Sequence, residues 1–126
     1  DYLEAGTMNT PGIAGFNEGL KYIEKTGISA ISRHEFILAG KLREGLKEIR
    51  RVKLFEPGTE HQPVAVVSFI VEGIDSGELG YVLEQAYGIL CRTGLHCAPC
   101  AHRTIGSFPQ GTVRFGLGYF NREEEV

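Results

Sequence analysis

A nearly continuous run of apolar, mostly β-branched residues at 64–71 constrains the fold most strongly. Only Ser68 interrupts it, so the run lacks the alternation of polar and apolar residues that marks a strand with one wet face. We therefore expect residues 63–71 to form a strand buried on both faces. Such a strand needs neighbouring strands at its edges and helices packed on the sheet.

Two amphipathic helices are predicted ahead of this strand. Thr10 and Pro11 suit an N-cap and first helical position, and Gly27 suits a C-cap. A second helix is expected at about 29–51, with its basic residues, Arg43 among them, on a solvated face. The apolar residues recur at helical spacing in both segments: Ile13, Phe16, Leu20 and Ile23, then Ile31, Leu38, Leu42, Leu46 and Ile49.

The remaining elements are predicted to be short. Asp75 should cap a helix that runs to about Tyr87, and Asn121 suits the N-cap of a helix that the sequence does not go on to complete. Strands are expected at 52–55, 89–92 and 112–119, with an irregular loop at 93–111. This order of elements predicts an α+β fold, or α/β sandwich, of one small sheet with helices packed on it.

Composition excludes several classes of protein. The chain has 126 residues, suited to one domain, and a net charge of −3, which argues against a nucleic-acid-binding protein. It contains no apolar stretch of membrane-spanning length, so no membrane partner is expected. Three cysteines, an odd number, do not form a disulfide framework and indicate a cytoplasmic setting.

The two ends of the sequence suggest a piece of a longer protein. The chain starts at Asp1 without an initiator Met, and it stops at residues 121–126, where a helix start signal has just appeared. A frayed acidic tail is the alternative. We expect the chain to have been cut from a larger protein.

Reactive side chains are concentrated at residues 92–103. Cys97, Cys100, His96 and His102 offer zinc-ligand chemistry, although structural zinc sites usually draw on two separated ligand pairs. Cys97 and Cys100 also form a Cys-x-x-Cys pair, as in thioredoxin-like dithiols, but close to the C-terminus rather than after a first strand. Neither alternative is excluded.

The third interpretation is one nucleophilic cysteine on a mobile loop. Cys97 lies between Gly94 and Pro99, and Arg92, His96 and Arg103 supply positive or proton-donating groups nearby. A neighbouring cation favours the thiolate, the form that attacks. Cys91, inside an apolar segment, instead suits a small buried hydrophobe.

Three segments carry a family resemblance. Residues 92–98 read Arg-Thr-Gly-Leu-His-Cys-Ala, residues 4–13 read Glu-Ala-Gly-Thr-Met-Asn-Thr-Pro-Gly-Ile, and residues 112–121 read Thr-Val-Arg-Phe-Gly-Leu-Gly-Tyr-Phe-Asn. In this order and spacing they resemble segments of the group II cysteine desulfurases, within the class V aminotransferase family. The resemblance covers essentially the whole chain.

The resemblance implies a fold and a domain organisation. Family members are dimeric pyridoxal-phosphate enzymes of fold type I, with a large domain that holds the cofactor lysine. This chain resembles an entry segment and helix at 1–28, followed by the small C-terminal domain at 29–126. That domain has a small, mostly antiparallel sheet with helices packed on one face. The large domain would be absent, so no cofactor is expected to bind this chain alone.

The resemblance also implies roles for individual residues. Cys97 matches the sulfur acceptor, which attacks the sulfur of the substrate L-cysteine so that alanine is released. His96 is a candidate for proton transfer. Arg114 matches the arginine that binds the substrate carboxylate, and a guanidinium suits this task because it offers a planar fork. Thr7 matches a position near the cofactor phosphate, that of the partner subunit. A sulfur-acceptor protein is a further expected partner, and no metal is expected.

Alternatives to these roles stay open. Arg114 also suits an internal salt bridge or an exposed edge, and Thr7 suits an ordinary turn. Cys100 departs from the family pattern, which has an apolar residue there; it suits a disulfide with Cys97 or a reaction with the persulfide of Cys97. Another class V enzyme, a selenocysteine lyase, and a stand-alone Cys-x-x-Cys redox or metal module are the competing functions.

Overall fold

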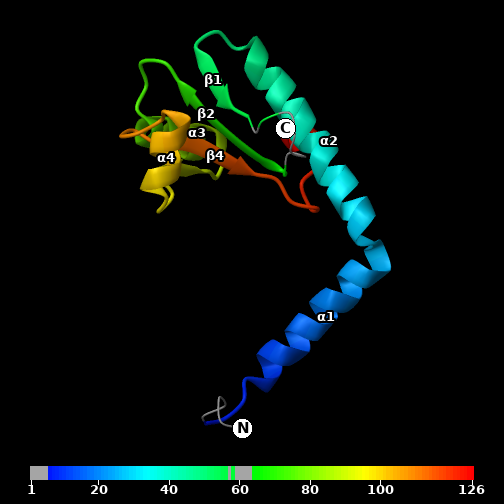
Figure 1. Ribbon diagram of the computed structural model, residues 1–126. Helices are drawn as coiled ribbons and strands as arrows, with labels where there is room; N and C mark the ends of the chain where they lie inside the picture. Colours follow the sequence, from blue (N-terminus) through cyan, green and yellow to red (C-terminus); the bar gives the residue numbers. More distant parts are fainter. Residues whose placement is uncertain (1–5, 57, 59–63) are drawn as a thin grey trace. The chain divides into compact units, whose positions relative to one another are not determined.

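The computed structural model describes residues 6–56, 58 and 64–126 (Figure 1). They fall into two compact units, Asp1–Arg33 and His34–Val126. The first unit holds helix α1 and the start of helix α2. The second holds the rest of α2, the sheet and the cysteine-containing loop.

Helix α1 spans Thr10–Thr26. Its N-cap is Asn9, whose side chain accepts a hydrogen bond from the backbone N–H of Gly12, so the prediction of Thr10 as the cap is wrong by one residue. Gly27 ends the helix with a positive φ of 86°, and its N–H donates to Ile23. No residue of α1 is buried, so its apolar stripe is exposed.

Helix α2 spans Ile28–Glu48, somewhat shorter than predicted at its C-terminal end. Leu38, Ala39 and Leu46 are buried. Arg43 is buried as well, contrary to the solvated position expected for it, because its guanidinium donates to the backbone oxygens of Val64 and Val66 at 2.9 and 3.1 Å. A buried charge needs such acceptors, and these two carbonyls supply them.

The sheet has four strands in the order β1-β2-β4-β3, with each neighbouring pair antiparallel. The strands are β1 (Val52–Phe55), β2 (Val66–Val71), β3 (Arg92–Gly94) and β4 (Thr112–Gly116). Helices and this small antiparallel sheet confirm the predicted α+β fold. Pro63, the expected first residue of the second strand, lies outside the described residues.

The core lies on one face of the sheet. Val67, Phe69 and Val113 are buried there, in one cluster with Ala39 and Leu46 of α2. Helix α3 (Ser76–Tyr87) adds two leucines to the edge of that cluster, and Asp75 caps it as predicted. The opposite face of β2 carries Ser68 and Ile70, which are only half-buried, so the expectation of a strand buried on both faces is wrong for that face.

Several short elements differ from the prediction. Helix α4 (Pro99–Ile105) lies inside the stretch expected to be a loop; it begins with a proline and ends at Gly106 in the left-handed region. Strand β3 starts at Arg92, the last residue of the strand predicted at 89–92. Strand β4 ends at Gly116, before the predicted end at residue 119. After the start signal at Asn121 there is only a single 3₁₀ turn, Glu123–Glu125, and its N-cap is Arg122.

Candidate active site on strands β3 and β4

Two arginines face each other across the strand pair that frames the cysteine loop. In the antiparallel register, Arg92 of β3 lies opposite Arg114 of β4, and Arg114 lies opposite Ser68 of β2. Residues that lie opposite each other project to the same side, and strand alternation places these three on the face away from Val113 and the core. Among the residues described, neither arginine has an acidic partner. The pair is therefore an uncompensated patch of positive charge.

His96 lies beside this patch, immediately before Cys97. Its Nε2 is 3.0 Å from the hydroxyl of Thr112, a residue that is 1% exposed. Its Nδ1 is buried and has no hydrogen-bond partner within the described part of the chain. Such an orphaned atom is rare in folded proteins and marks a position where a partner is expected.

The surroundings of His96 favour its neutral form. Burial lowers the pKa of His96 below the ordinary 6.5, and the positive charges of Arg114, His102 and Arg92 lower it further. The ring of His102 is 5.3 Å from that of His96, and its Nδ1 is 2.7 Å from the hydroxyl of Ser107. Because His102 and Ser107 are both buried, they fix one side of the His96 environment.

Cys97 occupies a strained turn. His96 and Cys97 both have positive φ, 51° and 61°, a conformation that L-residues other than glycine rarely adopt. The N–H of Ala98 donates to the oxygen of Leu95 at 2.8 Å and closes the turn. The Cys97 thiol is exposed at the tip. Strain of this kind often accompanies a functional group that the fold presents to a reactant.

The other two cysteines have different surroundings. Cys91 packs beside Gly80 of α3, and burial together with the charge of Glu84 raises the pKa of its thiol. This position fits the structural role expected for Cys91. Cys100 lies in the first turn of α4 and is exposed. Within the described part of the chain, no three His, Cys, Asp or Glu side chains are arranged to hold a metal ion.

A close backbone contact fixes the base of the cysteine loop. Gly111, with φ 76°, is buried where β4 begins, and a Cβ there would overlap the backbone carbonyl of Gly94. Gly94 ends β3 and also has a positive φ, 85°. Only glycine at 111 allows the two backbones to approach so closely. The contact between Gly111 and Gly94 therefore fixes the position of Gly94, from which the segment leading to Cys97 starts.

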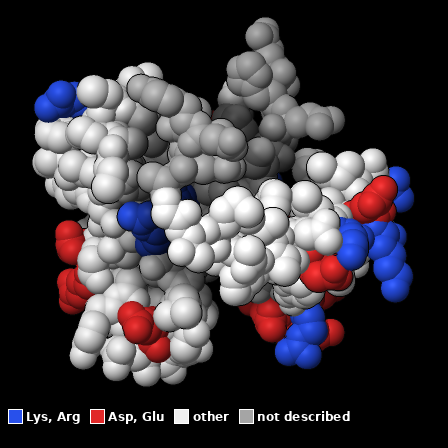
Figure 2. Space-filling view, turned by 90° about the horizontal axis from the view of Figure 1, so that it is seen from below, with Lys and Arg blue, Asp and Glu red and all other residues white. Residues whose placement is uncertain are grey.

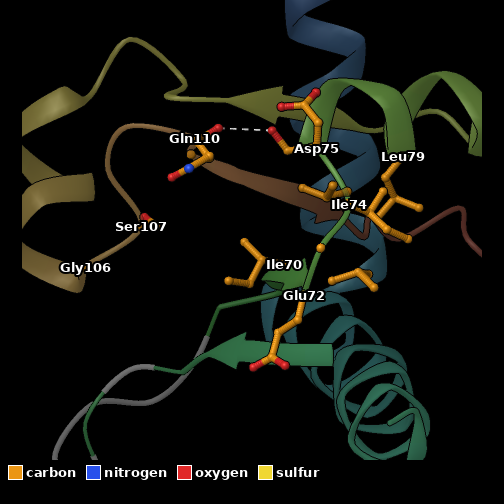
Figure 3. Close-up of a pocket in the computed structure, with 13 residues that line it drawn as sticks. Ile70, Glu72, Ile74, Asp75, Leu79, Gly106, Ser107 and Gln110 are labelled. Carbon is orange, nitrogen blue, oxygen red and sulfur yellow. Dashed lines mark hydrogen bonds between the residues drawn. The ribbon is translucent and has the colours of Figure 1, made fainter. Parts of the chain in front are cut away.

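A separate hollow of about 500 Å³ lies between the start of α3 and the segment that joins α4 to β4 (Figure 3). Glu72, Asp75 and Gln110 line it together with apolar side chains, and the Ser76 hydroxyl donates to the backbone oxygen of Gln110. No cysteine or basic residue belongs to its lining. The acidic lining would repel a carboxylate, so the hollow and the arginine pair are chemically distinct.

The remaining surface features add little to the site. Thr7, the residue expected near a phosphate, is exposed ahead of α1 in the first compact unit. In the view of Figure 2, basic and acidic side chains of the described residues are intermixed rather than gathered by sign. No described helix combines the length and apolar character needed to cross a bilayer.

Comparison with known proteins identifies the family. The model of the family "Aminotransferase class-V" matches residues 1–126. The chain belongs to the class-V aminotransferase family. A probable cysteine desulfurase of Mycobacterium leprae is 36% identical over 98% of this chain and 20% of its own length. One of Pyrococcus abyssi is also 36% identical, over 98% of this chain and 30% of its own length.

A solved structure agrees with this class-V assignment. Cysteine desulfurase from Thermococcus onnurineus, in its apo form, has a TM-score of 0.87 and 35% identity, with 97% of this chain and 30% of that chain covered. This class-V chain thus spans less than a third of the length of each of these relatives.

The structure brings together some of the residues that the sequence singled out. His96 and Cys97 share one turn, and the positive charge of Arg114 lowers the pKa of His96. Thr7 belongs to the other compact unit. Two relationships were not predicted: Thr112 contacts the His96 ring, and Arg92 lies opposite Arg114. Both relationships follow from the register of β3 on β4, which is known only from the folded structure.

Proposed function

We propose that this chain is the cysteine-bearing part of a pyridoxal-phosphate-dependent cysteine desulfurase, which converts L-cysteine to L-alanine and leaves a persulfide on Cys97. The observation that carries the proposal is the exposed Cys97, held in a strained turn next to His96 and the uncompensated Arg92–Arg114 pair. The family and its desulfurase relatives support the same reaction.

The arginine pair fits the carboxylate of an amino-acid substrate. Like charges directly opposite each other on a sheet repel, and an anion bound between them removes the repulsion. A guanidinium binds a carboxylate through two parallel hydrogen bonds. Arg114, half-buried on an inner strand, anchors the carboxylate, and Arg92 adds charge at the exposed side.

The same segment does not fit pyridoxal phosphate by itself. The cofactor needs a lysine for its aldehyde, and residues 92–116 contain none. Thr7, exposed and bearing a hydroxyl, is the position that suits the phosphate. We infer that the cofactor is held mainly by a large domain outside the chain, in a homodimer, and that residues 29–126 act as the small domain. When bound, the cofactor supplies an electron sink at the substrate.

Cys97 performs the sulfur transfer. Its thiolate attacks the sulfur of L-cysteine, so that an S–S bond forms as the substrate C–S bond breaks and the electron pair stays on the substrate carbon. That carbon gains a proton and leaves as alanine. With Nε2 of His96 donating to Thr112, Nδ1 carries the lone pair of the neutral ring, the form that can accept a proton.

The exposure of Cys97 suits the second half of the reaction. A persulfide there is accessible to the thiol of a sulfur-acceptor protein, and thiol exchange requires such access. The three free thiols support a reducing, cytoplasmic setting for the enzyme.

The test is to replace Cys97 in the enzyme that contains this chain. Cys97→Ala should abolish persulfide formation and alanine release while the cofactor's absorbance stays intact. Cys91→Ala is the matched control and should retain activity, because Cys91 packs beside α3. Full activity in Cys97→Ala would overturn the proposal in favour of another class-V reaction, such as one on selenocysteine, which a substrate screen would identify.

A further inference from the structure

Cys100 is an exposed thiol that the proposed reaction does not use. It follows Cys97 by three positions, and both thiols are free and exposed. Cys91, the remaining cysteine of the sequence, packs against α3. Cys100 is therefore the sole intramolecular thiol in a position to meet a sulfur species on Cys97.

The backbone between the two cysteines is short and is not fully extended. Three residues span at most roughly 10–11 Å when fully extended. Here Cys97 is in the left-handed region, the Leu95–Ala98 turn is closed by a hydrogen bond, and α4 begins at Pro99. One helical residue adds only about 1.5 Å of rise, so Cys100 stays close to the turn.

The remaining adjustment falls on the Cys97 turn. The sulfur that is attacked is the Sγ of Cys97 itself, so the product is an ordinary disulfide with a Cα–Cα separation of about 4.4–6.8 Å. The turn at Cys97 is exposed on a strained backbone and can relax as the thiol reacts. Helix α4 is anchored by the buried His102, so the movement is expected in the turn.

We propose that Cys100 is a resolving cysteine, which attacks the inner sulfur of the Cys97 persulfide, forms a Cys97–Cys100 disulfide and releases the outer sulfur as hydrosulfide. This inference rests on the proposed function, because that reaction supplies the persulfide. The Cys100 thiol gives up its proton, a new S–S bond forms, the old S–S bond breaks, and its electron pair leaves on the outer sulfur. No oxidant is needed.

The step gives the enzyme a second route for its sulfur. Hydrogen sulfide is a stronger acid than a cysteine thiol, and exchange is faster when the leaving thiol is more acidic. Hydrosulfide is therefore the better leaving group. In the absence of an acceptor protein, sulfide is the product and the active cysteine is left oxidised. A dithiol reductant then restores both thiols by exchange and becomes a disulfide itself.

The experiment charges Cys97 without cofactor or substrate, so that it succeeds or fails independently of the desulfurase reaction. The full chain is treated anaerobically with a small excess of inorganic polysulfide and desalted, and peptide masses and released sulfide are followed over time. Wild type should pass from a Cys97 persulfide to a Cys97–Cys100 disulfide with one sulfide released per disulfide. Cys91→Ala, the matched control, should do the same.

Cys100→Ser should keep the extra sulfur atom on Cys97, with a persulfide lifetime at least about tenfold longer than in wild type. Cys100→Ala should behave like Cys100→Ser, which shows that the thiol rather than the shape of the side chain matters. Equal persulfide lifetimes in wild type and Cys100→Ser, or a Cys100 that remains a thiol while sulfide is lost, would overturn the resolving role. Alanine production by the whole enzyme would be unaffected by that failure.

Discussion

Arg92 and Arg114 lie directly opposite each other on β3 and β4, and neither has an acidic partner among the described residues. Opposite residues on antiparallel strands have Cβ atoms about 4.5–5.5 Å apart, so two guanidinium groups there repel. A fold keeps such a pair when an anion binds between them. The relationship therefore makes opposite predictions for stability and for substrate binding.

Replacing either arginine should stabilise the chain while weakening substrate binding. Arg92→Gln and Arg114→Gln should each raise the free energy of unfolding by up to about 1 kcal/mol, because each removes the same repulsion. The double variant should gain less than the sum of the two. In the whole enzyme, Arg114→Gln should raise the KM for L-cysteine about 10- to 100-fold, the loss expected for a charged hydrogen bond. Urea unfolding and steady-state kinetics measure the two effects.

Arg50→Gln is the control for net charge. Arg50 is exposed after α2 and outside the sheet, so this variant should change neither stability nor KM appreciably. A loss of stability in both Arg92→Gln and Arg114→Gln, with additive effects, would mean that the two side chains do not repel each other.

Gly111 should tolerate no side chain. Gly111→Ala places a Cβ on the carbonyl of Gly94 and forces a residue with φ 76° into strain, so we expect a loss of at least about 2 kcal/mol in the free energy of unfolding. Gly116→Ala is the matched control on the same strand, with open space around the new methyl group. It should stay within about 1 kcal/mol of wild type. Equal urea midpoints for the two variants would show that the Gly94 contact is unimportant.

The helices and the sheet were largely predictable because their signals are local. The apolar stripe of α1, the Asp75 cap of α3 and the β-branched run of β2 each lie within one segment. The burial of Arg43 was not predictable because its acceptors, the carbonyls of Val64 and Val66, lie just before and at the start of β2, far along the sequence. Charge alone indicated a solvated arginine, and only tertiary structure shows the acceptors that permit its burial.

The cysteine loop was recognisable from its residues, whereas its surroundings were not. Helix α4 is not evident from the sequence although Pro99 and Gly106 mark its two ends, because its seven residues are too few to show an apolar period. The Arg92–Arg114 pairing depends on register, and the Thr112 contact with His96 depends on the same register. A one-residue shift of β3 would remove both.

The lowered pKa of His96 should make the fold sensitive to acid. Because the pKa of His96 is lower in the folded chain than its ordinary 6.5, the unfolded chain binds the proton first, and stability rises with pH. The contribution of His96 is complete above 6.5 and is lost as the pH falls through the lowered folded value. His96→Gln should therefore flatten the decline of unfolding free energy below this pH, measured by urea unfolding at a series of pH values.

Arg114→Gln tests the cause of that shift. It removes one of the charges that lower the pKa of His96, so the His96 titration midpoint, followed by NMR, should move back toward 6.5. A wild-type midpoint at or above 6.5 would contradict the burial and charge argument for His96.

The exposed apolar stripe of α1 should drive self-association of the isolated chain. Ile13, Phe16, Leu20 and Ile23 lie on one side of the helix and are 56%, 69%, 48% and 43% exposed. Contiguous apolar surface of this kind is uncommon on monomeric proteins and marks a contact site.

Phe16→Glu should raise the dissociation constant of the oligomer by about tenfold or more, because it removes one large side chain from the contact and introduces a charge. Ala14→Glu adds the same charge on the opposite side of α1 and should leave association unchanged. A wild-type chain that stays monomeric at high concentration in sedimentation equilibrium, or equal effects of the two variants, would show that this stripe does not mediate the contact.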